Sequence, residues 1–305
     1  MSDTVSYPTT LPNTLGADRL RLRSTAEGRV AADPARAGWR YLSFRAFSLE
    51  AGHQEELDAL CEHVVVVIQG ADVQLEPSVG PALGVVGRAS PFSSLPAAAY
   101  LPPGVGGVLR LAGTALPGRS LVAVASAPPS GRNRVAVRPV SIARDDIAVE
   151  IRGAGNATRQ INHIVAPDFQ ADRLEVVEVL TPSGNWSSWP PHKHDTDDMP
   201  TEAALEETYY YWFSRPESWG MQRLYRGDRS RDCNWEVRRG DVVLVTDGYH
   251  PFTAAHGDDA YYLNALAGDR RTMACSFDPD YDWVRETWAG LPRDPRVPFV
   301  RPGRA

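Results

Sequence analysis

The feature that most limits the fold is a series of short apolar runs separated by turn residues. After Trp39, runs of strand length recur about every 8 to 12 residues, with Gly, Pro, Asn or Asp between them. Helical periodicity is scarce, and only residues 278–291 suggest a helix, with acidic residues at its start and Gly290 near its end. The pattern predicts an all-β fold, either a sandwich or a barrel. Clear examples are HVVVVIQG (63–70), SLVAVAS (120–126), LEVVEVLT (174–181), ETYYYWF (207–213) and DVVLVTDG (241–248).

A weak internal repeat indicates how these strands are grouped. The strand that begins at Val64 is followed 40 residues later by a Pro-Pro-Gly turn that ends at Gly104. The strand that begins at Thr208 is followed, also 40 residues later, by a turn that ends at Gly248. Two barrels of roughly 110 to 130 residues would fill the chain, and repeats of this kind decide architecture. We therefore expect three parts: an N-terminal arm (1–35), an N-terminal barrel (36–144) and a C-terminal barrel (145–305).

Composition limits the partners and the compartment. A chain of 305 residues that is 43% hydrophobic can bury a sizeable core, and its net charge of −6 argues against nucleic acid or an anionic membrane surface as a partner. Its 3 cysteines are widely spaced and form no C-x-x-C pair, which favours reduced thiols over a disulfide framework or a zinc ribbon. The N-terminus lacks the features of a signal peptide, and no apolar run approaches the ~20 residues that span a bilayer. We expect a soluble cytoplasmic protein.

Three segments carry residue types that bind metal ions. His192 and His194 lie in WPPHKHD, and residues i and i+2 of a strand point to the same face, so both imidazoles can reach one ion. Glu206 and Glu207 open the strand LEETYYYWF, and a glycine turn in RGDVVLVTDGYHPF delivers His250. Three imidazoles and one carboxylate suit Zn²⁺, Mn²⁺, Fe²⁺ or Ni²⁺ and leave positions for water or substrate. The sequence predicts one divalent metal centre, with either glutamate as the fourth ligand.

Other histidines have plainer interpretations. A His-x-His pair alone is more often a surface or hydrogen-bonded pair than a metal site, and it is the two further segments in order that favour a metal. His256 is a backup ligand, but it lies in the polar tip AAHGDD, where we expect it to be solvated or at the pocket rim. His63 is a lone residue at a strand start, so we expect a structural role. No His-x-His precedes that strand, and VGG follows the first Pro-Pro-Gly turn. We therefore expect the N-terminal barrel to hold no metal.

These segments resemble the two cupin motifs, and the longer stretches resemble the 5-deoxy-glucuronate isomerase family of inositol catabolism. Ketol isomerases of the pectin pathway, which act on 5-keto-4-deoxyuronate, are similar. The resemblance covers nearly the whole chain after residue 35. The stretches that carry it are NWSSWPPHKHDTDDMPTEAALEETYYYWF (185–213), GDVVLVTDGYHPFTAAHGDDAYYLNALAG (240–268), GWRYLSF (38–44), GRAS (87–90), YLPPG (100–104) and RGAGNATRQ (152–160).

The resemblance implies a bicupin, that is, two tandem cupin (jelly-roll) barrels with a metal site only in the C-terminal one. The implied ligands are His192, His194, Glu207 and His250. The segment DTDDMPTEAALE lengthens the usual spacing to the glutamate and implies an inserted loop. Because the cupin glutamate directly precedes its strand, Glu207 is favoured and Glu206 would point outward. Zinc or manganese is the expected metal, with iron or nickel as alternatives, and no nucleotide or organic cofactor is expected. Bicupins commonly assemble through sheet edges, so a homo-oligomer is expected.

The implied activity is that of an intramolecular oxidoreductase, an aldose–ketose isomerase. It would convert 5-deoxy-D-glucuronate to 5-dehydro-2-deoxy-D-gluconate in myo-inositol catabolism. A divalent metal would chelate carbonyl and hydroxyl oxygens of this small sugar acid and stabilise an enediol(ate). Two other functions stay open. One is a different cupin metalloenzyme, either a 4-deoxy-5-keto-uronate isomerase or a dioxygenase. The other is a non-catalytic sugar-binding bicupin.

Strand alternation nominates the remaining site residues. If Glu207 faces the pocket, Tyr209 shares its face, and Tyr262 faces inward if Asn264 does. Both tyrosines are candidates for hydrogen bonding or acid–base catalysis, and filling of the core is the alternative. A cation should hold the substrate carboxylate. Arg223 is the first candidate, with a surface ion pair as its alternative.

Arg159 and His163 are second candidates for the pocket, and the general base is not assigned. Lys193 is the only lysine among 32 basic residues and lies between two histidines. A desolvated lysine can act as a base. Alternation nevertheless turns Lys193 away from a metal held by its neighbours, toward acidic partners in DTDD.

Overall fold

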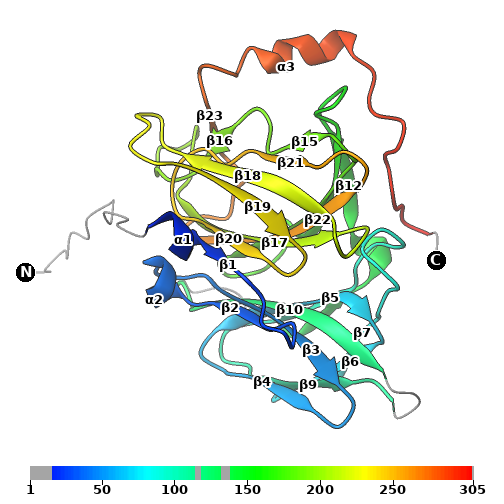
Figure 1. Cartoon of the computed structure of the whole chain (residues 1–305). Coiled ribbons are helices and arrows are strands. Elements are labelled where there is room, and N and C mark those ends of the chain that lie inside the picture. The colour runs from blue at the N-terminus through cyan, green and yellow to red at the C-terminus, as the bar shows by residue number, and fades with distance from the viewer. Residues whose placement is uncertain (1–15, 114–117, 132–137, 304–305) are drawn as a thin grey trace, which may run out of the picture.

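The fold consists of two β-sandwich units, one above the other in Figure 1, in a computed structural model that describes residues 16–113, 118–131 and 138–303. The all-β prediction is confirmed. The helix expected over 278–291 is confirmed in its second part, because residues 284–290 are helical. A local turn in which Asp278 accepts a hydrogen bond from the Asp280 backbone N–H replaces its first part. None of the described helices is long and apolar enough to cross a membrane. The helical elements are α1 (Ala17–Leu20), α2 (Pro34–Ala37), α3 (Val284–Thr287) and the 3₁₀ turns η1 (Arg144–Asp146) and η2 (Trp288–Gly290).

The first unit packs a six-stranded sheet, in the order β11-β8-β5-β10-β3-β2, against a four-stranded sheet, in the order β4-β9-β6-β7. Apolar side chains such as Phe47, Val65, Val124 and Leu109 fill the space between the sheets. This unit therefore has a continuous hydrophobic interior. Its strands are β2 (Val30–Ala32), β3 (Ser43–Glu50), β4 (Gln54–Leu57), β5 (Glu62–Gly70), β6 (Val73–Pro77), β7 (Leu83–Val85), β8 (Ala98–Leu101), β9 (Gly107–Leu111), β10 (Arg119–Ala127) and β11 (Val140–Ile142).

The second unit has a seven-stranded sheet, β1-β20-β17-β22-β14-β13-β12, opposite a four-stranded sheet, β15-β21-β18-β19, and a strand pair, β16-β23. Residues paired directly across neighbouring strands share a face, so the register identifies the side chains that point inside. The strands are β1 (Arg21–Leu22), β12 (Ala148–Arg152), β13 (Arg159–Val165), β14 (Leu174–Thr181), β15 (Trp186–Ser187), β16 (His192–Lys193), β17 (Leu205–Phe213), β18 (Trp219–Tyr225), β19 (Asp232–Arg238), β20 (Val242–Val245), β21 (Phe252–Ala254), β22 (Ala260–Gly268) and β23 (Ser276–Phe277).

The large sheets of the two units pack against each other. Their facing side chains belong to one hydrophobic cluster, in which Phe44 contacts Tyr210 with ring centroids 5.7 Å apart. Arg88 of the first unit and Glu178 of the second form an ion pair inside this interface, and both side chains are 0% exposed. A buried pair of this kind specifies one relative placement of the units, because either charge alone would be left without a partner.

Two glutamates join the units in a reciprocal manner. Glu206 of β17 accepts hydrogen bonds at 2.6 to 2.9 Å from the backbone N–H groups of residues 40–42 in the first unit. Glu62 of β5 accepts hydrogen bonds at 2.5 to 2.9 Å from those of residues 172–174 in the second. Each glutamate lies two residues before the start of its repeated strand. The internal repeat seen in the sequence thus corresponds to equivalent contacts in space.

The segment expected to be an arm contributes to both units. Within residues 1–35, β1 pairs with β20 of the second unit and β2 pairs with β3 of the first. Residues 1–15 lie outside the described part of the chain. Residues 16–32 therefore connect the two sheets by strand pairing. The boundary near residue 145 stays a prediction.

Candidate metal centre

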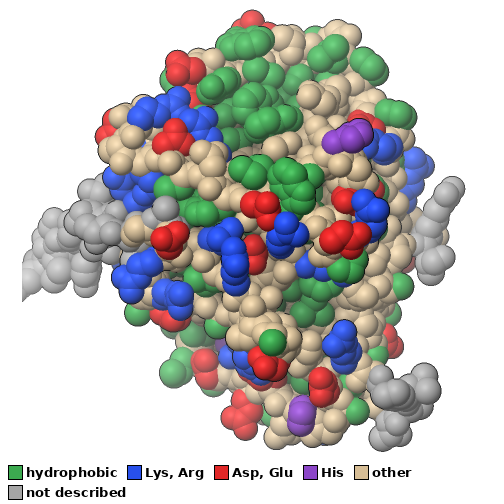
Figure 2. Space-filling view, in the orientation of Figure 1, with side chains coloured by type: hydrophobic (Ala, Val, Ile, Leu, Met, Phe, Trp, Pro, Cys, Tyr) green, Lys and Arg blue, Asp and Glu red, His purple; other side chains and the backbone are tan. Residues whose placement is uncertain are grey.

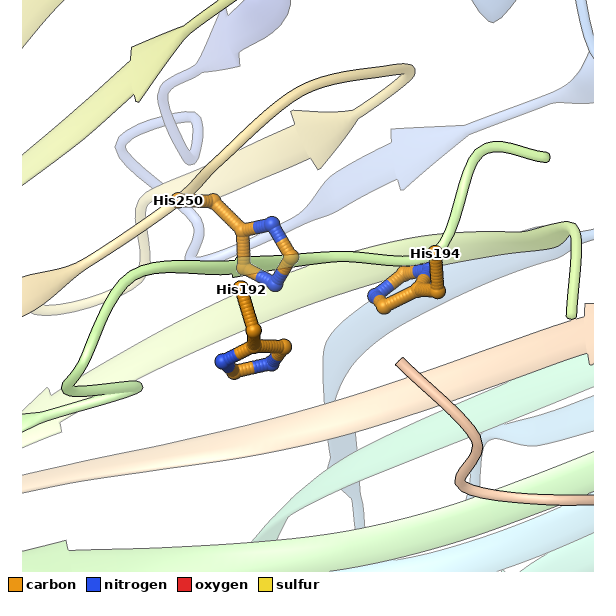
Figure 3. A group of neighbouring side chains, drawn as sticks. All are labelled: His192, His194 and His250. Atoms are coloured by element: carbon orange, nitrogen blue, oxygen red, sulfur yellow. The ribbon is translucent and has the colours of Figure 1, made fainter. Parts of the chain in front are cut away.

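Three histidines, two from one strand and the residue that follows it and one from a turn, meet inside the second unit. His192 lies on β16 and His194 follows that strand. His250 comes just after the turn that follows β20 and contains Gly248. Their nearest ring nitrogens all lie within 4.8 Å of one another (Figure 3). The i, i+2 spacing brings the first two together, and Gly248 takes a φ of 86° that a residue with a side chain rarely adopts.

Glu207 lies beside the three histidines, and Glu206 does not. The Glu207 Oε2 atom lies 2.9 Å from His194 Nε2 and 3.3 Å from His250 Nε2. Glu206 is on the opposite face of β17, where it binds the backbone of the first unit. The alternation that favoured Glu207 therefore agrees with the placement of both side chains.

The backbone orients two of the rings toward the same point. Nδ1 of His250 lies 3.0 Å from the Gly248 carbonyl oxygen, and Nδ1 of His194 lies 3.1 Å from the Leu205 carbonyl oxygen. A proton on Nδ1 in each ring leaves the Nε2 lone pair free to bind a metal. Nε2 of His250 is buried and has no hydrogen-bond partner in the described part of the chain. The free lone pair of this nitrogen and the ligand atoms around it fit a divalent metal ion.

The ionisation of these histidines also suits a metal. Burial, together with His250 and His194, holds the pKa of His192 well below its usual range. Burial lowers the pKa of His250 to about 4. Burial would lower the pKa of His194 too, but its hydrogen bond to Glu207 and the Glu207 charge raise it. The rings of His192 and His250 are thus neutral at pH 7. On His194, a proton would compete with the metal ion for the ring nitrogen.

A group of hydroxyls lies beside the histidines, as alternation predicts. Tyr209 pairs with Asn264, and its ring centroid lies 5.8 Å from that of His250 and 4.8 Å from that of Tyr262. The Tyr209 hydroxyl lies 2.8 Å from Ser188 Oγ. Burial raises the pKa of Tyr209 and of Tyr262, so both phenols stay protonated and can donate hydrogen bonds.

Arg223, the first candidate for the cation that holds the substrate carboxylate, lies on the side of β18 away from the histidines. Its neighbour Gln222 faces the interior and donates to the His250 carbonyl oxygen at 2.7 Å, so Arg223 points to the outer face of β18. There it forms a bidentate pair with Asp232 at 2.6 and 2.8 Å, on the wall of a cavity of about 200 Å³. The surface ion pair that was its alternative is what the structure contains.

Arg159, one of the second candidates for the pocket, has its guanidinium buried inside the second unit. It is opposite Arg152 in the β12–β13 register, is 5% exposed, and donates to the carbonyl oxygens of Ala157 and Trp189. No carboxylate pairs with it in the described ranges. Burial lowers its pKa to about 10. A buried guanidinium that has only carbonyl partners is suited to an anionic ligand.

The other second candidate, His163, lies at the edge of this interior. Its Nε2 is 3.0 Å from Glu150, which also binds Arg152 at 2.7 and 2.9 Å. Glu150 and Arg152 are partly exposed, so this trio is open to solvent. The positive charge of Arg152 contributes to the low pKa of His192. The charge of Arg152 therefore acts on the histidines from the solvent-exposed edge of the sheet.

Comparisons with known proteins identify the family. A model of the KduI/IolB family matches residues 19–284. The chain belongs to the KduI/IolB family. It is 38% identical over 268 residues to a 5-deoxy-glucuronate isomerase of Geobacillus thermodenitrificans, covering 86% of this chain and 93% of the relative. It is 51% identical over 146 residues to the isomerase of the same name from Geobacillus kaustophilus, covering 48% of this chain and 53% of the relative. The alignment thus spans about half the length of several curated relatives.

Solved structures agree with this placement in the KduI/IolB family. An IolB-like protein from Salmonella typhimurium LT2 superposes with a TM-score of 0.80 at 33% identity, over 87% of this chain and 98% of that one. Oxalate decarboxylase of Lactobacillus farciminis superposes with a TM-score of 0.57 at 12% identity, over 85% of this chain and 88% of that one. The second likeness concerns the fold alone. The expected bicupin architecture is confirmed.

The remaining histidines of this KduI/IolB member lie outside the group. His256 is exposed. His63 occupies the repeat position equivalent to Glu207, but its ring nitrogens lie 2.7 Å from Ser126 Oγ and 2.8 Å from the Asp58 carbonyl oxygen. Both have the plainer roles expected of them. Among the described residues, His192, His194 and His250 form the group of potential ligands.

Sequence reasoning missed Glu175, a second carboxylate inside the unit. Glu175 and Glu207 both pair with Leu266 of β22, so the two glutamates share the inner face. Glu175 is 1% exposed, so its carboxyl group is removed from solvent. Burial raises its pKa to about 7, although Arg271 and His194 oppose this shift. The two glutamates of LEVVEVLT are three residues apart and so point to opposite faces of the strand, which could have indicated that one of them faces inward.

Replacing Glu175 by leucine should stabilise the metal-free protein, more strongly at pH 8 than at pH 5. The folded-state pKa is about 7 against an ordinary value of 4.5, so the parent loses stability as pH rises between these values. The leucine variant avoids this loss, which amounts to about 3 kcal/mol above pH 7. Urea unfolding at both pH values measures the difference, with Glu175→Gln as the isosteric control. An equal difference at the two pH values would contradict the assignment.

Proposed function

We propose that this protein isomerises 5-deoxy-D-glucuronate to 5-dehydro-2-deoxy-D-gluconate in myo-inositol catabolism. The observation that carries the proposal is the convergence of three histidines and Glu207 in a chain that is 38% identical to a 5-deoxy-glucuronate isomerase over 93% of that relative. The reaction is an intramolecular oxidation and reduction. A proton leaves the carbon next to the aldehyde and one is added to the aldehyde carbon. The hydroxyl on the first carbon loses its proton and becomes the ketone, while the former aldehyde oxygen gains a proton and becomes the primary alcohol, so atoms and electrons balance within the substrate.

We infer that His192, His194, Glu207 and His250 hold one divalent ion, zinc or manganese by their chemistry. When bound, such an ion supplies Lewis acidity, which favours the negative charge that develops on the substrate oxygens. Tyr209 and Tyr262 stay protonated, so we assign them as hydrogen-bond donors to these oxygens and not as bases. Gln222 supports the site from the other sheet by fixing the backbone carbonyl of His250.

Arg159 is our choice for the residue that binds the substrate carboxylate, in place of Arg223. Its guanidinium is inside the same unit as the histidines, and its charge contributes to the low pKa of His192. Arg152 lies opposite it at the solvent-facing edge, where its charge can attract the anionic substrate. We therefore expect the carboxylate end of the substrate to bind on the β12–β13 side of the interior.

Replacing Arg159 by methionine should raise KM for the sugar acid by about 10- to 100-fold, the value of a charge-assisted hydrogen bond inside a protein. Arg223→Met is the matched control, because it removes the same side chain from the outer face of β18. We expect its KM to stay within about twofold of the parent. Steady-state kinetics on 5-deoxy-D-glucuronate measure both. Equal effects of the two substitutions would contradict the assignment.

The function is tested by following the conversion of 5-deoxy-D-glucuronate under anaerobic conditions, with 4-deoxy-5-keto-uronate as the second substrate. Anaerobic formation of the ketose supports the proposal. Turnover of only the other substrate would assign the related uronate isomerase, and O₂ consumption would assign a dioxygenase. Tight binding of the sugar acid without turnover would indicate a binding protein.

We also infer a cytoplasmic homo-oligomer. The described structure contains Cys61, Cys233 and Cys275 as free thiols, which suits a reducing compartment. Apolar side chains gather on the upper face in Figure 2, over the region of β18 and α3, and Trp283 is 59% exposed. Patches of this kind commonly mark contacts between protein chains. Light scattering measures the assembly directly.

A further inference from the structure

Lys193 lies between two of the histidines, but its side chain points away from them. Its Nζ donates hydrogen bonds to Asp195 Oδ1 at 2.7 Å and to the two oxygens of Glu202 at 2.8 and 2.9 Å. Thr196 Oγ1 lies 3.3 Å from the same atom. All three partners belong to the loop between His194 and β17, so the ammonium is surrounded by that loop.

Glu202 uses the same carboxylate to shape the loop. Its Oε1 accepts hydrogen bonds at 2.8 Å from the backbone N–H groups of Asp195 and Thr196. The loop then leads to Leu205, whose carbonyl oxygen contacts His194 Nδ1 and whose strand carries Glu207. The Lys193–Glu202 pair therefore lies between the His-x-His strand and the strand that supplies the carboxylate.

Asp195 extends the network to the third segment. Its Oδ2 accepts a hydrogen bond at 2.7 Å from the backbone N–H of Gly248. The Gly248 carbonyl oxygen in turn contacts Nδ1 of His250 at 3.0 Å. One ammonium thus connects, through two carboxylates, every chain segment that contributes to the histidine and glutamate group.

We propose that Lys193, with Asp195 and Glu202, is a positioning residue that holds the three ligand-bearing segments in the geometry that binds a metal ion. The inference rests on the proposed function only in assuming that these four side chains bind a metal. Outer hydrogen-bond partners of metal ligands typically change metal affinity by 10- to 100-fold, because they fix ligand orientation before the ion arrives.

The charge and shape of lysine suit this role. The Lys193 Nζ donates to carboxylate oxygens of both Asp195 and Glu202, so one cationic group neutralises two acidic ones within the loop. An ammonium is a compact charge with three donors, whereas the guanidinium donates in a planar fork. Every other basic residue among the chain's 32 is arginine, so lysine at this position stands out.

The test is the dissociation constant for Zn²⁺ and Mn²⁺, measured by chelator competition without substrate. Lys193→Met should raise it about 10- to 100-fold, and Asp195→Asn should raise it in the same direction while disturbing the loop less. Lys193→Arg should recover only part of the affinity. The Co²⁺-substituted Lys193→Met protein should show an altered visible spectrum, which reports ligand geometry directly. Circular dichroism verifies that each variant is folded.

Arg270→Met is the matched control, because Arg270 forms an exposed ion pair with Asp197 of the same loop and touches none of the network. Its metal affinity should equal that of the parent. Parental affinity and parental Co²⁺ spectra in both the Lys193→Met and Asp195→Asn proteins would overturn the proposal. A parent that binds no metal would overturn it together with the metal centre. A parent that binds metal but lacks isomerase activity would refute the proposed function alone.

Discussion

Replacing Glu207 by glutamine is expected to lower kcat/KM for 5-deoxy-D-glucuronate by about 10³-fold or more and to weaken metal binding strongly. The amide removes the one anionic group of the proposed ligand set, next to two histidine nitrogens at 2.9 and 3.3 Å. A loss of this size corresponds to about 4 kcal/mol of transition-state stabilisation. Steady-state kinetics together with metal content per chain measure the two effects.

Glu206→Gln is the adjacent control, identical in chemistry and opposite in face. Glu206 accepts three backbone hydrogen bonds from the first unit, so its replacement should cost stability, about 1 to 3 kcal/mol in urea unfolding. Metal content and kcat should stay close to those of the parent. If Glu206→Gln lost the metal and Glu207→Gln kept it, the assignment of the ligand would be wrong.

The largest loss of stability is expected from Arg88→Met. Its partner Glu178 would be left at a fully buried interface without a cationic partner, although Asn162 would still donate a hydrogen bond to it. Removal of one member of a buried ion pair typically costs about 3 to 5 kcal/mol. Urea unfolding monitored by tryptophan fluorescence measures this loss.

The double variant Arg88→Met/Glu178→Leu separates the missing contact from the stranded charge. It should recover a large part of the lost stability, because no charge remains buried. Recovery should be incomplete, since Arg88 also donates to the carbonyl oxygens of Ile68 and Ser94. A loss below about 1 kcal/mol for Arg88→Met would contradict the role of this pair in joining the units.

Much of the metal centre could be predicted because its residues obey local rules. The period of two places His192 with His194 and separates Glu207 from Glu206, and a turn glycine precedes His250. The direction of Arg223 could not be derived in the same way, because MQRLY has no clear polar face. Gln222 faces inward to bind Tyr211 and the His250 backbone, and this need arises only from the assembled unit.

The features that could not be predicted depend on contacts distant in sequence. Strand β14 is buried on both faces, so its pattern does not distinguish Glu178, which pairs with Arg88 in the first unit, from Glu175, which lies inside the second. Strand β1 has two residues and pairs with β20 more than 200 residues later. Local propensity carries no information on such pairing.

Removal and return of the metal ion tests directly whether this protein is a metal-dependent isomerase. The measurement is kcat for anaerobic conversion of 5-deoxy-D-glucuronate by the parent protein, as purified, after chelation, and after addition of one equivalent of Zn²⁺ or Mn²⁺. We predict that chelation lowers kcat by about 10³-fold or more and that one of the two ions restores it. Undiminished isomerisation by protein shown to be metal-free, or no isomerisation by the fully loaded protein, would contradict the account.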